Sequence, residues 1–179
     1  MARIARVVAP NIPYHITQGG TGGTVEEMSM VSQEFMAFAL RQGVGRGHQQ
    51  EGVMARVLVV DDEADFADFL QEFLTRKGYT VSIAYDGPEA LQRVEADRPH
   101  IVLLDIKLPR MNGLEVLRQI REINQEIGVI MVTGIREEAT GQQALALGAF
   151  DYLTKPLDLP YLERILWHKV ALMNLQGVG

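Results

Sequence analysis

The chain has 179 residues, with 17 basic against 23 acidic side chains and a formal net charge of −6. Because it contains no cysteine, a disulfide framework, a thiolate nucleophile and a cysteine-ligated metal are excluded. It has no run of about 18 apolar residues and no signal-peptide pattern at its start, so we expect neither a membrane span nor export. These features predict a cytoplasmic globular protein, and its net acidity argues against direct nucleic-acid binding.

The composition changes near Met54. Residues 1–53 have no net charge and hold 8 of the 17 glycines, whereas residues 54–179 carry the whole charge of −6. Dense glycine raises the entropic cost of ordering the backbone and offers little to bury. We therefore expect residues 1–53 to be a poorly packed leader with at most one short helix, which would begin at Thr24 and end near Gly43. That helix is either an amphipathic docking segment or, as we favour, a marginal helix without a partner.

From Arg56 onward, apolar runs alternate with amphipathic segments. Val57–Val60 is a continuous apolar run, as expected for a parallel strand covered on both faces. Gly78 ends the amphipathic segment that follows this strand. Pro88 predicts the start of the next helix, because the first residues of a helix have no intrahelical partner for their N–H groups and proline lacks that group. The expected strands are 57–60, 80–84, 101–104, 129–132 and 149–153, and the expected helices are about 66–74, 87–96, 113–123, 136–147 and 159–173.

Strand–helix units in unbroken succession require a parallel sheet with right-handed crossovers and helices on both faces. The pattern therefore predicts an α/β, doubly wound, five-stranded domain of about 120 residues, which is enough to bury a core. Its ligands should bind beyond the carboxyl ends of the strands.

Polar side chains follow four of the five expected strands directly. They are, in chain order, Asp61, Asp62, Glu63, Asp105, Thr133 and Lys155. Because parallel strands end at one edge of a sheet, these side chains should meet there. Crowded carboxylates raise one another's pKa, and Mg²⁺, which prefers oxygen ligands, would relieve the repulsion. Helix capping by residues 61–63 is the alternative for the first acidic group taken alone.

The same side chains suit phosphoryl transfer. Asp105 could act as a nucleophile that forms an acyl phosphate, while the Lys155 ammonium and the Thr133 hydroxyl stabilise the transferring oxygens. The Lys155–Pro156 bond is a candidate cis peptide that would turn the lysine inward. Taken alone, Lys155 would be read as a solvated loop charge.

Four segments resemble the receiver domain of two-component response regulators, over about residues 54–175. They are Val59–Glu63, Val102–Gly113, Val132–Gly134 and Asp151–Pro156. The resemblance implies a flavodoxin-like fold with strand order 2-1-3-4-5 and a regulatory phosphoacceptor, not an enzyme with an external substrate.

The resemblance also implies the residues of a magnesium site. Asp105 is similar to the phosphoacceptor, and Asp61 and Asp62 to the acidic pair that holds Mg²⁺, with Asp62 the more direct ligand. The main-chain carbonyl of Lys107 would complete the protein ligands. The Lys107 side chain is not fixed by the family pattern, and we hypothesise that it affects the lifetime of the phosphoryl group.

Further roles follow from the same resemblance. Thr133 and Lys155 match the residues that contact the phosphoryl group, and Gly134 leaves room for the donor. Tyr152 matches an aromatic switch residue whose ring turns inward when Thr133 moves toward the phosphate. Phosphorylation would then shift the population of a two-state element.

The resemblance implies partners as well. The phosphoryl donor would be a sensor histidine kinase or a histidine phosphotransfer protein. Too few residues follow Pro156 for an output domain, so we expect a stand-alone receiver. It would signal through the face made by the fourth helix, the fifth strand and the fifth helix, and it could form a homodimer when phosphorylated.

Two other functions fit the residues less well. A phosphatase of the haloacid-dehalogenase type needs a second Asp two residues after the nucleophile as general acid, and this chain has Lys107 there. A pseudo-receiver, which binds a partner without being phosphorylated, is disfavoured because the implied functional residues are all present.

The first twenty or so residues resemble the N-terminus of REP-associated tyrosine transposases. No His-x-His metal motif follows them, so transposase activity does not carry over. We expect residues 1–53 to be a non-functional extension and residues 54–179 to form the receiver domain, with the functional protein starting at Met54.

Overall fold

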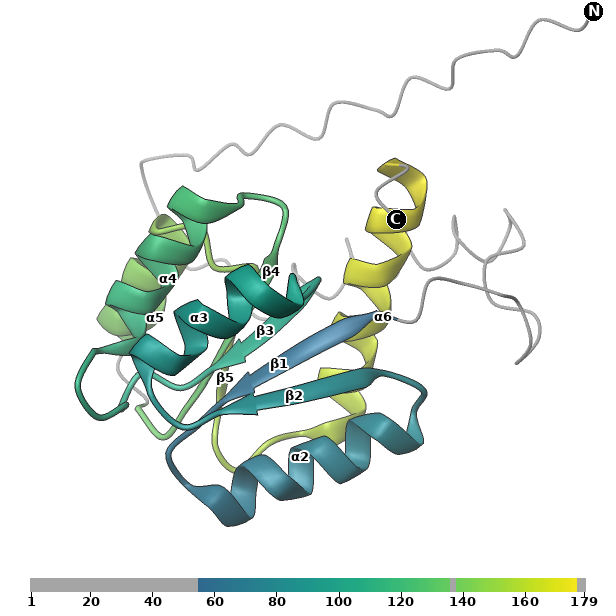
Figure 1. The fold of residues 1–179 in the computed structure, drawn as a ribbon, viewed down its shortest axis with the longest axis horizontal. Coiled ribbons are helices and arrows are strands. Elements are labelled where there is room, and N and C mark those ends of the chain that lie inside the picture. The colour runs from purple at the N-terminus through teal and green to yellow at the C-terminus, as the bar shows by residue number, and fades with distance from the viewer. Residues whose placement is uncertain (1–54, 136–137, 177–179) are drawn as a thin grey trace, which may run out of the picture. The chain divides into compact units, whose positions relative to one another are not determined.

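A computed structural model describes residues 55–135 and 138–176 (Figure 1). The predicted leader, its helix and its boundary at Met54 lie outside these residues. The elements, in chain order, are β1 (Arg56–Val60), α2 (Ala64–Arg76), β2 (Thr80–Ala84), α3 (Gly87–Asp97), β3 (Ile101–Leu104), α4 (Gly113–Ile123), β4 (Gly128–Thr133), α5 (Glu138–Ala146), β5 (Asp151–Thr154) and α6 (Leu159–Gln176).

The strands form one parallel five-stranded sheet in the order β2-β1-β3-β4-β5. The predicted doubly wound α/β fold and its strand order are therefore confirmed. In the register of the sheet, Val60 lies beside Ala84 on one side and beside Leu104 on the other. The residues that follow β1 and β3 consequently emerge at the same height, at the carboxyl edge of the sheet.

Helices cover both faces of the sheet (Figure 1). Alternate residues of β1 enter different cores, because successive side chains of a strand point to opposite faces. Leu58 and Val60 pack with buried residues of α3, α4 and α5, whereas Val57 and Val59 pack with those of α2 and α6. All four side chains are buried, as the unbroken apolar run of this strand predicts.

Two helices begin as the sequence predicts. Asp86 caps α3 by accepting the amide of Glu89 at 2.9 Å, with Pro88 in the first turn. Asn112 caps α4 by accepting the amide of Leu114 at 2.8 Å.

The expected start of the fifth strand is two residues too early, since β5 begins at Asp151. The Ala149 amide donates to the carbonyl of Ala144, and Gly148 has a φ of +94°. Residues 148 and 149 therefore finish the end of α5 instead of pairing in the sheet. The last helix continues to Gln176, three residues beyond its expected end. Within the described residues, no helix is both long and apolar enough to cross a bilayer.

Candidate functional site

The carboxyl edge of the sheet holds the fully buried polar side chains of the described residues. Asp61 after β1 is 2% exposed, Asp105 after β3 is 5% exposed, and Thr133 at the end of β4 is fully buried. The Asp105 amide donates to the carbonyl of Val60 at 2.9 Å, which extends the pairing of β1 with β3 by one residue. Buried polar groups need hydrogen-bond partners, and here the partners are the Lys155 ammonium and backbone amides of the adjoining loops.

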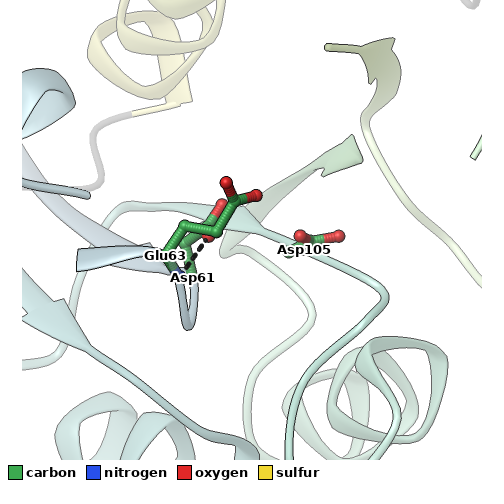
Figure 2. Close-up of side chains that lie close together, drawn as sticks. All are labelled: Asp61, Glu63 and Asp105. Carbon is green, nitrogen blue, oxygen red and sulfur yellow. Dashed lines mark hydrogen bonds between the residues drawn. The ribbon is translucent and has the colours of Figure 1, made fainter. Parts of the chain in front are cut away.

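Three carboxylates converge at this edge. Asp61, Glu63 and Asp105 each offer an oxygen, and these atoms all lie within 4.8 Å of one another. Figure 2 shows Asp61 and Glu63 side by side, with Asp105 next to them on the neighbouring strand end. A compact set of carboxylate oxygens is the donor type that Mg²⁺ prefers, so these residues fit a divalent cation.

The structure does not bring Asp62 into this group; its side chain is exposed like that of Glu63, but only Glu63 places an oxygen near the other two carboxylates. Glu63 takes part instead, although the sequence analysis does not predict it as a ligand. Glu63 is the N-cap residue of α2, yet its side chain makes no capping hydrogen bond. Asp61 does not cap the helix either, because its Oδ1 accepts the amide of Glu63, the N-cap residue itself, at 3.0 Å. The capping alternative is therefore not borne out for α2. In the sequence, Glu63 is the last residue of an acidic run, which marks it as a candidate ligand. The run does not tell in which direction the Glu63 side chain points.

Lys155 lies among the three carboxylates, with its side chain only 15% exposed. Its Nζ is 2.7 Å from Asp61 Oδ2, 2.8 Å from Glu63 Oε1 and 3.3 Å from Asp105 Oδ2. The bond from Lys155 to Pro156 is cis, as predicted. Lys155 is therefore part of a buried charge cluster and is not a solvated loop charge.

Burial and charge pull the pKa values of this cluster in opposite directions. Burial raises the pKa of Asp61, and the hydrogen bond from Lys155 works against that rise. Burial alone would lower the pKa of Lys155, but its hydrogen bonds to Asp61 and Glu63 and the charge of Asp105 raise it on balance. Lys155 consequently carries its positive charge throughout the neutral range.

An aromatic ring completes the surroundings of this lysine. Nζ of Lys155 lies 4.2 Å from the ring centroid of Phe66 on α2, a cation–π contact. Phe66 also packs against the apolar core shared by α2 and α6. Beside it is an apolar surface groove, whose lining residues are Phe66, Phe69, Lys155, Pro156, Leu157 and Leu159.

The two oxygens of Asp105 have different environments. Oδ1 accepts the amides of Ile106 at 2.5 Å and Lys107 at 3.2 Å, so the backbone of the following loop holds it. Oδ2 faces the Lys155 ammonium. The chain returns at Gly113, where any Cβ would overlap the Asp105 carbonyl oxygen and come within 2.8 Å of Ile106 Cα. The Lys107 side chain itself is exposed.

Thr133 and Tyr152 meet at the backbone of Ile135. The Ile135 amide donates to Thr133 Oγ1 at 3.3 Å, and the Tyr152 hydroxyl donates to the Ile135 carbonyl at 2.7 Å. Tyr152 is half-buried and packs against the core on the side of α3, α4 and α5. Gly134, between the two contact points, is exposed. Thr133 and Tyr152 are therefore linked by hydrogen bonds to one shared residue.

The sequence matches a known protein family. Residues 57–166 match the response regulator receiver domain. The chain is 43% identical over 103 residues to the alkaline phosphatase synthesis transcriptional regulatory protein PhoP of Bacillus subtilis, a match that covers 58% of this chain and 43% of PhoP. It is 40% identical over 119 residues to the response regulator MprA of Mycobacterium ulcerans, which covers 66% of this chain and 50% of MprA.

Solved structures give the same result. A CheY-like response regulator receiver domain protein from Methanospirillum hungatei matches with a TM-score of 0.66 and 31% identity, over 69% of this chain and 98% of that one. A two-component response regulator from Clostridium difficile matches with a TM-score of 0.65 and 28% identity, over 67% and 98%. The chain spans about half the length of the relatives PhoP and MprA, but nearly the whole of these solved domains.

Proposed function

The chain belongs to the response regulator receiver domain family, whose members are phosphoacceptors of two-component signalling, and we propose that Asp105 is its phosphoacceptor. The observation that carries this proposal is the arrangement of the Asp105 carboxylate. One oxygen is fixed by backbone amides, and the other faces the Lys155 ammonium. The donor would be a phosphohistidine on a sensor histidine kinase or on a histidine phosphotransfer protein.

The proposed cofactor is Mg²⁺. Asp61, Asp105 and the main-chain carbonyl of Lys107 would hold it, with Asp62 or Glu63 as the further carboxylate. The convergence of three carboxylate oxygens within 4.8 Å supports this choice. When bound, the ion would neutralise negative charge on the phosphoryl oxygens and the carboxylates.

The residues of the chain would act as follows during transfer. An Asp105 carboxylate oxygen forms a bond to phosphorus while the bond from phosphorus to the donor imidazole nitrogen breaks, so the product is an acyl phosphate. The Lys155 ammonium stabilises the charge on the transferring oxygens. The Thr133 hydroxyl accepts the Ile135 amide in the present structure, so its hydrogen remains available for donation to the phosphoryl group.

The proposed output is a shift between two arrangements of the β4–α5 loop. A phosphoryl group that draws Thr133 toward Asp105 would act on Ile135, and hence on Tyr152, through the two hydrogen bonds described above. The face formed by α5, β5 and α6 would then bind a downstream protein or a second copy of the chain. Phosphorylation changes the populations of the two states only as far as it stabilises one over the other.

The test is incubation with a small-molecule acyl phosphate, with and without Mg²⁺, followed by intact-mass measurement. We expect the wild type to gain one phosphoryl group only with the metal, and Asp105→Asn to gain none. Asp97→Asn, a matched change at the far end of α3, should behave as the wild type. Absence of labelling in all proteins would instead support a phosphorylation-independent pseudo-receiver, and multiple turnover of a phosphate ester would support a phosphatase.

A further inference from the structure

An ion pair ties the loop between β3 and α4, residues 105–112, to the beginning of α3. The Arg110 guanidinium donates to Oδ2 of Asp86. The Asp86 side chain is 13% exposed, whereas that of Arg110 is 64% exposed. The other oxygen of Asp86 accepts the Glu89 amide at 2.9 Å and caps the helix. The Asp86 carboxylate therefore caps the N-terminus of α3 and also binds the loop.

Arg110 holds a backbone conformation that arginine disfavours. Its φ is +69°, in the left-handed region, and the Met111 amide donates to the Pro109 carbonyl at 2.8 Å. This is a γ-turn centred on Arg110, a turn that is rare and strained when φ is positive. Glycine would adopt it without cost. The ion pair to Asp86 gives a physical reason for arginine here.

The backbone beside the ion pair is closely packed as well. Gly87, the first residue of α3, lies against Met111, since a Cβ on Gly87 would come within 2.7 Å of Met111 Cβ. Farther along, the Gly113 amide donates to the Ile106 carbonyl at 2.9 Å and brings the loop back against Asp105. The loop is thus fixed at α3 on one side and at the phosphoacceptor on the other.

We propose that Arg110 and Asp86 are positioning residues for the phosphorylation site. Their ion pair holds the loop in which the Lys107 carbonyl follows Asp105, and so it keeps both groups in place for a divalent cation. This inference rests on the proposed function, because the cation site is part of it. Neither residue touches the reacting atoms. An ion pair with one exposed partner makes a modest contribution, so its loss should weaken Mg²⁺ binding by about twofold to fivefold.

Two variants remove the ion pair while leaving the helix cap and the positive φ possible. Asp86→Asn keeps a side chain that caps helices well, and Arg110→Gly is free to adopt the positive φ. The double variant should lose no more Mg²⁺ affinity than either single variant, since both changes break one interaction. Arg98→Gly is the matched control, because Arg98 also has a positive φ of +47° but lies at the opposite end of α3.

Two measurements on the full chain test the inference. Calorimetric titration with MgCl₂ gives the Kd, and amide hydrogen exchange of the metal-free protein follows Leu108, Met111 and Gly113, whose N–H groups bond within the loop. We expect a higher Kd and faster exchange at these amides in both single variants, with wild-type values in Arg98→Gly. Thermal melting confirms that each variant is folded.

The outcomes separate the two proposals. Unchanged exchange and unchanged Kd in folded Asp86→Asn and Arg110→Gly would overturn the positioning role while leaving the magnesium site intact. Faster exchange with an unchanged Kd would also overturn it, because the ion pair would then hold the loop in the wild type without affecting the binding of Mg²⁺. If the wild type itself takes up no Mg²⁺, the proposed cation site fails and the inference fails with it.

Discussion

Replacing Lys155 by methionine should expose the repulsion that the lysine now neutralises. The change keeps a side chain of similar length but leaves Asp61 and Asp105, both almost fully buried, without their shared cation. Breaking a buried ion pair costs about 3–5 kcal/mol, and an exposed pair contributes about 0–1 kcal/mol. Because Glu63 is 66% exposed and the cluster lies at the rim of the sheet, we expect an intermediate loss of about 2 kcal/mol.

The assay is urea unfolding at neutral pH in the presence of a chelator, and then with MgCl₂. A loss of about 2 kcal/mol corresponds to a fall of about 8 °C in Tm for a domain of this size. A cation that binds only the folded state stabilises it by about 1.4 kcal/mol when present at roughly ten times its Kd. Since Lys155 no longer competes for the carboxylates in the variant, Mg²⁺ should stabilise the variant more than the wild type.

The matched control is Lys77→Met. Lys77 forms its ion pair with Glu163 at 2.9 Å, but both side chains are more than two-fifths exposed. This variant should lose less than about 1 kcal/mol and gain nothing extra from Mg²⁺. If Lys155→Met were as stable as the wild type in chelator, or if Mg²⁺ widened the gap between them, the charge cluster would not act as described.

Three further predictions follow from the site and the fold. Gly113→Ala should lose more than about 2 kcal/mol of unfolding free energy, because its Cβ would overlap the Asp105 carbonyl; chemical denaturation showing a loss below about 0.5 kcal/mol would contradict this. Lys107→Ala should change the autodephosphorylation rate, followed by release of phosphate from the labelled protein; an unchanged rate would exclude a role for the ammonium. His100 accepts the Arg56 amide at 2.9 Å, and burial and the nearby Arg56 charge lower its pKa. The neutral imidazole should therefore contribute fully to the free energy of unfolding above about pH 6.5, and this contribution should be lost as the pH falls through the lowered pKa of the folded state. Unfolding free energies from about pH 7.5 to about pH 5 should therefore fall more steeply in the wild type than in His100→Gln, and equal slopes would refute the assignment.

Local chemistry determined most of the fold. The apolar run Val57–Val60 predicted a strand covered on both faces, and all four of its side chains are buried. The Gly87–Pro88 pair predicted the start of α3, which begins there. The boundary before β5 was wrong because the Ala149 amide bonds back to α5, a contact that hydropathy does not encode.

Part of the candidate site could likewise be predicted from the sequence. The sequence by itself determined which residues leave the carboxyl ends of the strands, since chain order and strand spacing are local properties. It therefore predicted that Asp61, Asp105 and Lys155 would meet, and their atoms do.

Only the tertiary structure decided where each side chain points. It directs Glu63 toward Lys155 while Asp62 faces outward, and it joins Arg110 to Asp86 across 24 positions of sequence. These choices depend on rotamers, on packing between α2, α3 and the loops, and on competition among charges at one edge. A linear pattern of residue types does not contain that information, because direction is set by neighbours that the chain brings together only when it folds.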